Sequence, residues 1–210
     1  MVLKIVQAGE PVLRQRAREL TPEEIGSEAT RQLIQLMRDT MRDAPGVGLA
    51  APQVGVGLRL VVIEDRAEYQ AGASPADLAL RERSPVAFHV LINPKLVVED
   101  PTPMEFHEGC LSVNGFAALV ARARGVRVEA LDENGQPVSV SARGWYARII
   151  QHELDHLDGT LYVDRMETRS LTTQENQRRH WLGKSTAQVR TALGLGLPEQ
   201  TSSIPRKDLT

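Results

Sequence analysis

Two histidines and a glutamate near residue 150 have the spacing of a catalytic metal site. Residues 151–156 read QHELDH, which matches the pattern HExxH. Histidines four positions apart lie on one face of a helix and can bind the same metal ion, with the intervening glutamate beside the open coordination position. His152 and His156 are therefore candidate metal ligands, and Glu153 is a candidate general base for a hydrolytic water.

The surrounding residues indicate that this pattern lies on a largely buried helix. Residues 147–150 read ARII, and Leu154 and Leu157 add further apolar side chains. The pattern could arise by chance on a solvated helix, but buried imidazoles need partners, and a metal ion is an efficient partner for two of them. Asp155 and Asp158 are interpreted as solvated or helix-capping carboxylates, although Asp155 could orient a metal-bound histidine or pair with a basic residue.

A catalytic site of this kind needs a third protein ligand and leaves the fourth position to water. The only cysteine of the chain, Cys110, lies in the segment EGCLS at 108–112. Its glycine permits a tight turn, and Glu108 and Ser112 can support metal ligands through hydrogen bonds. The alternatives are that Cys110 is a small buried thiol or that a third histidine completes the site. The candidate histidines, none in a comparable pattern of small and polar residues, are His89, His107 and His180.

A third segment, GVGLAAPQVG at 46–55, is rich in small residues. A substrate backbone could run close to it and pair with it as an added strand, and Gln53 could supply an amide donor. The alternative is a glycine-rich turn that leads into a strand. The segment is not a phosphate-binding loop, because it lacks the lysine that should follow the second glycine.

Helix and strand signals place these segments in a mixed structure. Residues 21–24 read TPEE, a capping box with proline at the first helical position, and they predict a helix that continues until APG at 44–46. The helix with HExxH should run over 146–157 and end at Gly159. The polar region 64–85 is interpreted as an inserted surface loop with one short helix at 76–83.

Runs of apolar and β-branched residues predict several strands, and the turn DENG at 132–135 joins two of them in a β-hairpin. The predicted strands lie at 58–63, 86–98 with an interruption at Asn93-Pro94, 126–131, 137–141 and 161–163. Together these signals predict the α+β class, with a single domain of mainly antiparallel sheets around a central metal-binding HExxH helix.

Composition favours one soluble domain of 210 residues. With 41% apolar residues, 25% charged residues and a net charge of -2, the chain has no basic field for binding nucleic acid. One cysteine excludes an internal disulfide, and no run of about eighteen apolar residues predicts a membrane span. Because the first residues resemble neither a signal peptide nor a transit peptide, we expect a cytoplasmic protein.

In this order, the segments GVGLAAPQVG, EGCLS and QHELDHLDG closely resemble the three signature motifs of the peptide deformylase family. The resemblance extends from about residue 5 to about residue 169 and includes LINP at 91–94 and GTLYVD at 159–164. It implies a deformylase-like catalytic domain at 1–170 and a C-terminal extension at 171–210 that is partly helical and then disordered from 197 onward.

One departure from many bacterial members is that SVNGF at 112–116 lacks their proline shortly after the serine. Together with GW at 144–145 and the long insertion before residue 91, it makes the chain similar to the branch found in plant and animal organelles. The absence of a transit peptide favours a bacterial cytoplasmic protein. The departure leaves the substrate groove beyond the first residue open.

The resemblance implies hydrolysis of the N-formyl group from the N-terminal formylmethionine of new polypeptides, with release of formate. It implies Fe²⁺ as the native metal, with Zn²⁺, Ni²⁺ or Co²⁺ also possible, held by Cys110, His152 and His156. Two imidazoles and a thiolate taken alone would indicate zinc. Partners would be N-formylmethionyl nascent polypeptides at the ribosome exit, without recognition of nucleic acid or membrane.

The resemblance also assigns further roles. Glu153 would take the proton of the attacking water and pass it to the leaving amine. The metal, the Gln53 amide and the backbone N–H of Leu111 would stabilise the oxyanion. Residues expected to contact the methionine side chain, besides the apolar edge of His152, are Val47, Gly48, Trp145 and Ile149.

Two other classes of function fit parts of the sequence. An HExxH metallo-endopeptidase would use the same metal machinery on internal peptide bonds, although cysteine as third ligand argues against it. A non-catalytic module that binds nascent chains would need neither Glu153 nor Gln53, and a structural metal site would tend to have four protein ligands. Formate release from a formyl-Met peptide distinguishes these classes.

Overall fold

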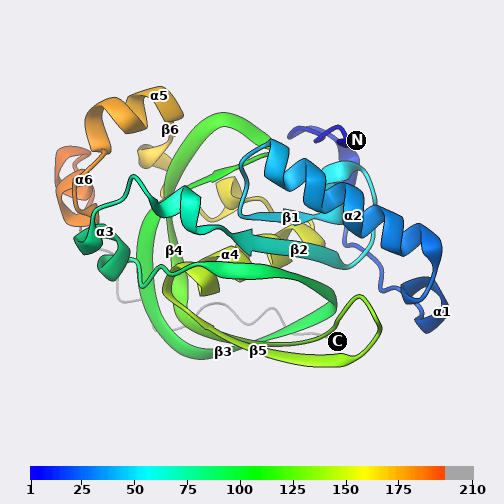
Figure 1. Cartoon of the computed structure of the whole chain (residues 1–210). Coiled ribbons are helices and arrows are strands. Elements are labelled where there is room, and N and C mark those ends of the chain that lie inside the picture. Colours follow the sequence, from blue (N-terminus) through cyan, green and yellow to red (C-terminus); the bar gives the residue numbers. More distant parts are fainter. Residues whose placement is uncertain (197–210) are drawn as a thin grey trace.

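Six antiparallel strands form one sheet that curves around a central helix in residues 1–196, the part of the chain that the computed structural model describes (Figure 1). The strand order is β1-β2-β3-β4-β5, and β6 pairs separately with β4. The strands are β1 (Gly48–Ala50), β2 (Leu60–Asp65), β3 (Val86–Cys110), β4 (Val113–Leu131), β5 (Pro137–Arg143) and β6 (Thr172–Thr173). The predicted α+β class and antiparallel sheet are confirmed.

The long hairpin of β3 and β4 forms the central part of the sheet. Its register runs from Ile92 opposite Leu131 to Cys110 opposite Val113, with shifts at several points. The predicted interruption at Asn93 is present, because Asn93 has a φ of 51° and the register shifts there. The strand nevertheless continues far beyond the predicted end at 98, because β4 supplies backbone partners along its whole length.

The central helix α4 (Gly144–Leu157) carries the HExxH segment, close to its predicted bounds. Its apolar face is buried in a cluster with side chains of β2, β4 and β5. Ile150 and Leu157 are fully buried in this cluster, and burial of each such side chain stabilises the fold by about 1.5–3 kcal/mol. Gly159, with a φ of 74°, follows the helix in the left-handed conformation that ends helices.

The first predicted helix is two helices in the structure. The capping box of Thr21 and Glu24 is present, but α1 (Pro22–Ile25) stops at Gly26, and Ser27 caps a new helix, α2 (Glu28–Asp43). Prediction of a single helix was wrong because Ser27 offers its hydroxyl to the N–H of Thr30 and so favours a second start. The buried face of α2 packs in a second cluster with β1 and β2.

The insertion at 64–85 covers the start of α4. It contains a single-turn helix at Ala67–Gln70 and α3 (Pro75–Leu80), a little earlier than the predicted short helix. Arg81 accepts a hydrogen bond from the N–H of Trp145 through its carbonyl oxygen, at 2.8 Å. Gly144 permits this approach, because a Cβ there would lie 2.4 Å from the Cβ of Glu82.

The prediction of a strand at 161–163 was wrong, because a single 3₁₀ turn, Tyr162–Asp164, lies there. The carboxylate of Asp164 accepts from the N–H of Leu161 and favours the turn. The other 3₁₀ turns are Pro11–Arg14, Ala51–Val54, Ala67–Gln70 and Thr168–Ser170.

After β6, the chain forms α5 (Gln174–Asn176), a π-helical turn at Gln177–Trp181 and α6 (Thr186–Ala192). The predicted disorder from 197 onward lies outside the described residues. Within residues 1–196, no helix has the length and apolar character needed to cross a membrane.

Candidate metal centre and active-site cavity

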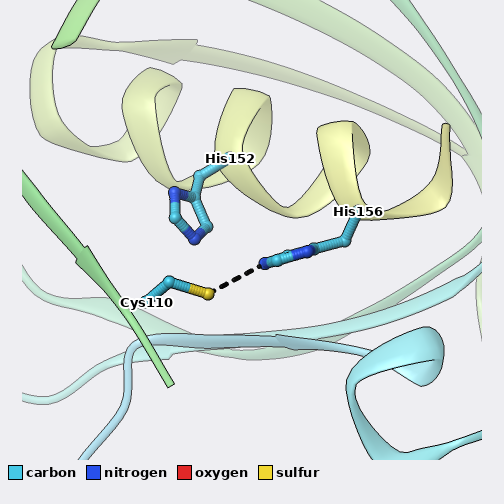
Figure 2. Close-up of side chains that lie close together, drawn as sticks. All are labelled: Cys110, His152 and His156. Carbon is cyan, nitrogen blue, oxygen red and sulfur yellow. Dashed lines mark hydrogen bonds between the residues drawn. The ribbon is translucent and has the colours of Figure 1, made fainter. Parts of the chain in front are cut away.

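The thiol of Cys110 and the imidazoles of His152 and His156 converge on one point (Figure 2). One potential ligand atom from each residue lies within 4.8 Å of the other two, and Sγ of Cys110 is 3.2 Å from Nε2 of His156. The two histidines are one helical turn apart on α4, and Cys110 ends β3 opposite them. Three such donors, with no fourth in the group that residues 1–196 form, match a catalytic rather than a closed structural metal site.

The local sequence explains this placement. The register between β3 and β4 shifts at Gly109 and Cys110, so the cysteine lies at the tight end of the hairpin. On α4, the buried apolar residues hold one face of the helix against the sheet. The 3.6-residue period then directs His152 and His156 together toward the hairpin end.

Glu108 supports the metal-ligand candidate His152. Its Oε2 lies 3.0 Å from Nδ1 of His152, which leaves Nε2 of that ring to face the cluster. Glu108 is itself buried and accepts two hydrogen bonds from Arg122 and one from Arg148. Burial opposes ionisation, but Arg122 and then His152 hold the pKa of the Glu108 carboxyl well below its usual range. A carboxylate that orients a histidine ligand is typical of functional metal sites.

Asp155 continues this network to the surface. Its carboxylate accepts from Arg122 and forms a two-bond pair with Arg165. The suggestion that Asp155 pairs with a basic residue is therefore confirmed, whereas Asp158 pairs with Arg59 at 2.7 Å.

The charges at the cluster suit a cation. Burial lowers the pKa of His156 well below its usual value and keeps that imidazole neutral. Burial also disfavours a charge on His152, but Cys110 and Glu108 outweigh it and raise the pKa of His152 well above its usual value. A neutral imidazole is the form of histidine that binds a metal, so His156 is ready to act as a ligand.

Glu153 lies beside the cluster with one oxygen free. Its side chain is buried, and Oε2 has no hydrogen-bond partner among the described residues. Burial raises the pKa of Glu153 to about 7, which suits a group that takes and returns a proton near neutral pH. A Cβ at Gly48 would lie 2.4 Å from Oε1 of Glu153, so this position of the carboxylate requires glycine at 48.

Gln53 holds its amide at the same site. Its Oε1 accepts from the N–H of Ala50 at 2.8 Å, which fixes the orientation of the amide group. Its Nε2 donates toward Ser112 Oγ at 3.4 Å and toward Cys110 Sγ at 3.5 Å. The amide donor therefore points at the cluster from the 3₁₀ turn that follows β1.

A cavity of about 440 Å³ opens onto the cluster. It is lined by Gln53, Leu111 and Glu153. It is also lined by all the residues that the sequence indicated for the methionine pocket, which are Val47, Gly48, Trp145 and Ile149. Residues that sequence reasoning did not place there include Asn114, Arg148 and Gln174. Of these three, only Arg148 could have been found from the sequence, because it is a cation within an apolar run and lies four residues before His152 on the same helix.

The rival histidines lie outside the cluster. His89 faces Tyr146, whose hydroxyl lies 2.9 Å from its Nε2. His107 lines the cavity wall, and burial lowers its pKa to about 4. His180 packs beside Trp181 in the C-terminal segment.

An HExxH helix that faces a cysteine and a buried glutamate across a curved antiparallel sheet defines a metal-dependent hydrolase. Residues 2–171 match the family model of polypeptide deformylase. The chain therefore belongs to the peptide deformylase family, whose activity is the hydrolytic removal of N-formyl groups. This membership confirms the family resemblance and the metallohydrolase class expected from the three motifs.

Two curated relatives and one solved structure illustrate the similarity. Peptide deformylase 1A, chloroplastic, of Solanum lycopersicum is 50% identical over 82% of this chain, which spans 62% of that protein. Peptide deformylase 3 of Streptomyces avermitilis is 47% identical over 94% of this chain and 86% of its own length. The Met-Ala-Ser bound class I type b peptide deformylase of Acinetobacter baumannii has a TM-score of 0.70 and 32% identity, over 79% of this chain and 99% of its own.

Proposed function

We propose that this chain removes the formyl group from the N-terminal formylmethionine of newly synthesised polypeptides and releases formate. The observation that carries the proposal is the cluster of Cys110, His152 and His156. Cys110 and His152 line one cavity together with Glu153, whose Oε2 has no hydrogen-bond partner among the described residues. The peptide Met-Ala-Ser, bound by the Acinetobacter relative, has the sequence that such a reaction leaves behind.

Cys110, His152 and His156 would hold the metal, which when bound supplies Lewis acidity toward the formyl oxygen and acidifies water. Glu153 accepts the proton of the attacking water and then delivers it to the amine as the C–N bond breaks. Its raised pKa suits both steps, because a base with a pKa near the working pH can also act as the acid.

Two neutral donors complete the proposed chemistry. The Gln53 amide and the backbone N–H of Leu111 stabilise the negative oxygen that develops when the formyl carbon becomes tetrahedral. Gln53 suits this role because Ala50 fixes its amide and leaves Nε2 directed at the cluster. Loss of one such donor typically lowers kcat about a hundredfold or more.

Substrate enters this proposal as an added strand beside β1. That strand ends the strand order, with β2 as its neighbour in the sheet, and Gly48 lies at the cavity wall. A peptide main chain can pair with such an edge whatever its side chains are. The first side chain would then lie against Val47, Gly48, Trp145 and Ile149, where an unbranched methionine fits an irregular apolar wall.

We further propose Fe²⁺ as the metal in the cell, with Zn²⁺, Ni²⁺ or Co²⁺ able to replace it. Two imidazoles and a thiol can bind several of these ions, so the ligand types leave the choice of metal to availability. The proposed location is the bacterial cytoplasm. There the protein would meet nascent chains at the ribosome exit. The similarity to a Streptomyces protein supports the bacterial setting. Residues 1–170 form the proposed catalytic domain, and 171–210 form its extension.

The test is formate release by anaerobically purified protein from formyl-Met-Ala-Ser, with acetyl-Met-Ala-Ser and an internally cleavable peptide as comparisons. Formate from the formyl peptide, with little turnover of the other two, is expected. Cleavage of the internal peptide without formate would favour a metallo-endopeptidase. No reaction of any metal-loaded form with any of the three would favour a module that only binds nascent chains.

A further inference from the structure

One wall of the cavity is formed by a residue beyond the catalytic motifs. Gln174 lines the cavity together with Gly109, Cys110 and Glu153. It is the first residue of α5 and lies three positions after the end of the family match at residue 171. The segment that follows the family match therefore reaches the cavity.

This segment is held firmly against the sheet. Thr172 and Thr173 form β6, which pairs with Ala117 and Phe116 of β4. Just before it, Ser170 Oγ accepts from the N–H of Leu119 at 2.8 Å. Thr173 then caps α5 by accepting from the N–H of Asn176. These contacts fix the backbone at Gln174, so its side chain leaves from a set position.

The amide of Gln174 lies over the backbone of Gly109. A Cβ on Gly109 would lie 3.3 Å from Nε2 of Gln174, so glycine at 109 leaves room for the amide. Gln174 is half-buried, and its side-chain amide has no hydrogen-bond partner among residues 1–196. An amide without a protein partner in a cavity wall can hydrogen-bond a polar group of a ligand.

The position of Gly109 indicates which ligand group this is. Gly109 precedes Cys110 in β3, and one residue of a strand spans about 3.3 Å. A substrate with its formyl carbon at the metal cluster would place its following peptide groups in the cavity that Gly109 and Gln174 line. Gln174 would therefore meet the peptide groups that follow the methionine.

We infer that Gln174 is a specificity-determining residue that hydrogen-bonds the main chain of the substrate after the formylmethionine. The inference rests on the proposed function and adds a reason for preferring polypeptides over free formylmethionine. Because the partner is a peptide group, the contact favours binding of longer substrates. It does not depend on which side chain follows the methionine. Loss of one neutral hydrogen bond to the substrate corresponds to about a two- to tenfold decrease in kcat/KM.

The test compares the wild-type protein with Gln174→Leu, which keeps the size of the side chain but removes the amide, and with Gln174→Ala. Substrates are formyl-Met-Ala-Ser, formyl-Met-Leu-Ser and formylmethionine. We expect kcat/KM to fall about two- to tenfold, mainly through KM and equally for the two tripeptides, with no change for formylmethionine. Glu175→Leu, at the exposed neighbouring position, should behave as the wild type.

Binding of the product peptide gives a readout independent of turnover. Calorimetry should show Met-Ala-Ser binding weakened by the same factor in both Gln174 variants. An equal loss of kcat/KM on all three substrates would overturn the inference, because it would indicate a disturbed metal site. Unchanged kinetics in Gln174→Leu would overturn it as well. Absence of formate from every substrate with wild-type protein would instead refute the proposed function, and the inference with it.

Discussion

At the scale of single residues, the site separates metal binding from proton transfer. Cys110, His152 and His156 bring their donor atoms together, while Glu153 keeps one oxygen unpartnered beside them. The buried Glu108 orients His152 from behind and takes no place in the cluster. Each role can therefore be removed by a separate substitution.

Glu153→Ala should keep the metal and lose turnover. The side chain is expected to move protons and to contribute no ligand atom, so kcat should fall by roughly 10²–10⁴-fold. Metal content by atomic absorption and formate release, measured on the same preparation, check both parts. Full activity in this variant would refute the assigned mechanism, and loss of the metal would show that Glu153 also supports the ligands.

Gly48→Ala should lower kcat by displacing the same carboxylate. The added methyl group would lie 2.4 Å from Oε1 of Glu153, and this carboxylate must move away. We expect at least a tenfold loss of kcat with the metal retained and with little change in thermal stability. Gly57→Ala is the matched control, because a Cβ there has nothing within 4 Å. Equal effects of the two substitutions would contradict the proposed role of Gly48.

At the scale of elements, α2 is tied to β2 by one ion pair of good geometry. Arg42 donates two hydrogen bonds to Glu64, both at 2.7 Å. This pairing lowers the pKa of the Glu64 carboxyl below its ordinary value of 4.5. Because the folded pKa lies below the unfolded one, the pair stabilises the fold above pH 4.5, and this contribution is lost as the pH falls through the folded pKa.

Glu64→Gln should therefore destabilise the protein by up to about 1 kcal/mol at neutral pH and by progressively less at acid pH. Urea unfolding at several pH values between neutrality and the acid limit checks the expected convergence with the wild type. Glu28→Gln is the control, since the Glu28 side chain is 79% exposed and its pair with Arg31 should contribute little. A difference that stays constant with pH would exclude the ion pair as its cause.

At the scale of the whole molecule, the metal would join two distant parts of the chain. Cys110 ends β3 at the turn of the β3–β4 hairpin, and the histidines lie on α4. An ion held between them would therefore restrain the hairpin and the helix. A ligand that binds only the folded state stabilises it by about 2.7 kcal/mol at a hundredfold excess over Kd. Chelation should accordingly lower Tm by about 5–10 °C.

Differential scanning calorimetry with and without chelator measures this shift. Glu153→Ala should retain it, whereas Cys110→Ser should reduce it by weakening metal binding. An unchanged Tm after confirmed loss of the metal would mean that the hairpin and α4 are held together by packing alone.

The sequence by itself determined the local elements and the chemical types at the site. The HExxH helix, the hairpin around residues 132–135 and the antiparallel sheet follow from periodicity, turn residues and caps, which act between neighbours in the chain. The three motifs also indicated the family. Signals of this kind are less decisive where two elements compete, as at Gly26 and Ser27, where one predicted helix became two.

Only the tertiary structure decided how the site is assembled. The thiol of Cys110 meets His156 across 46 positions of sequence, and Arg122 meets Glu108 from the opposite strand of the long hairpin. The reach of Gln174 depends on the pairing of two threonines with β4. Such contacts depend on sheet curvature and on buried charges that must find partners, and neither is encoded in any short stretch of residues.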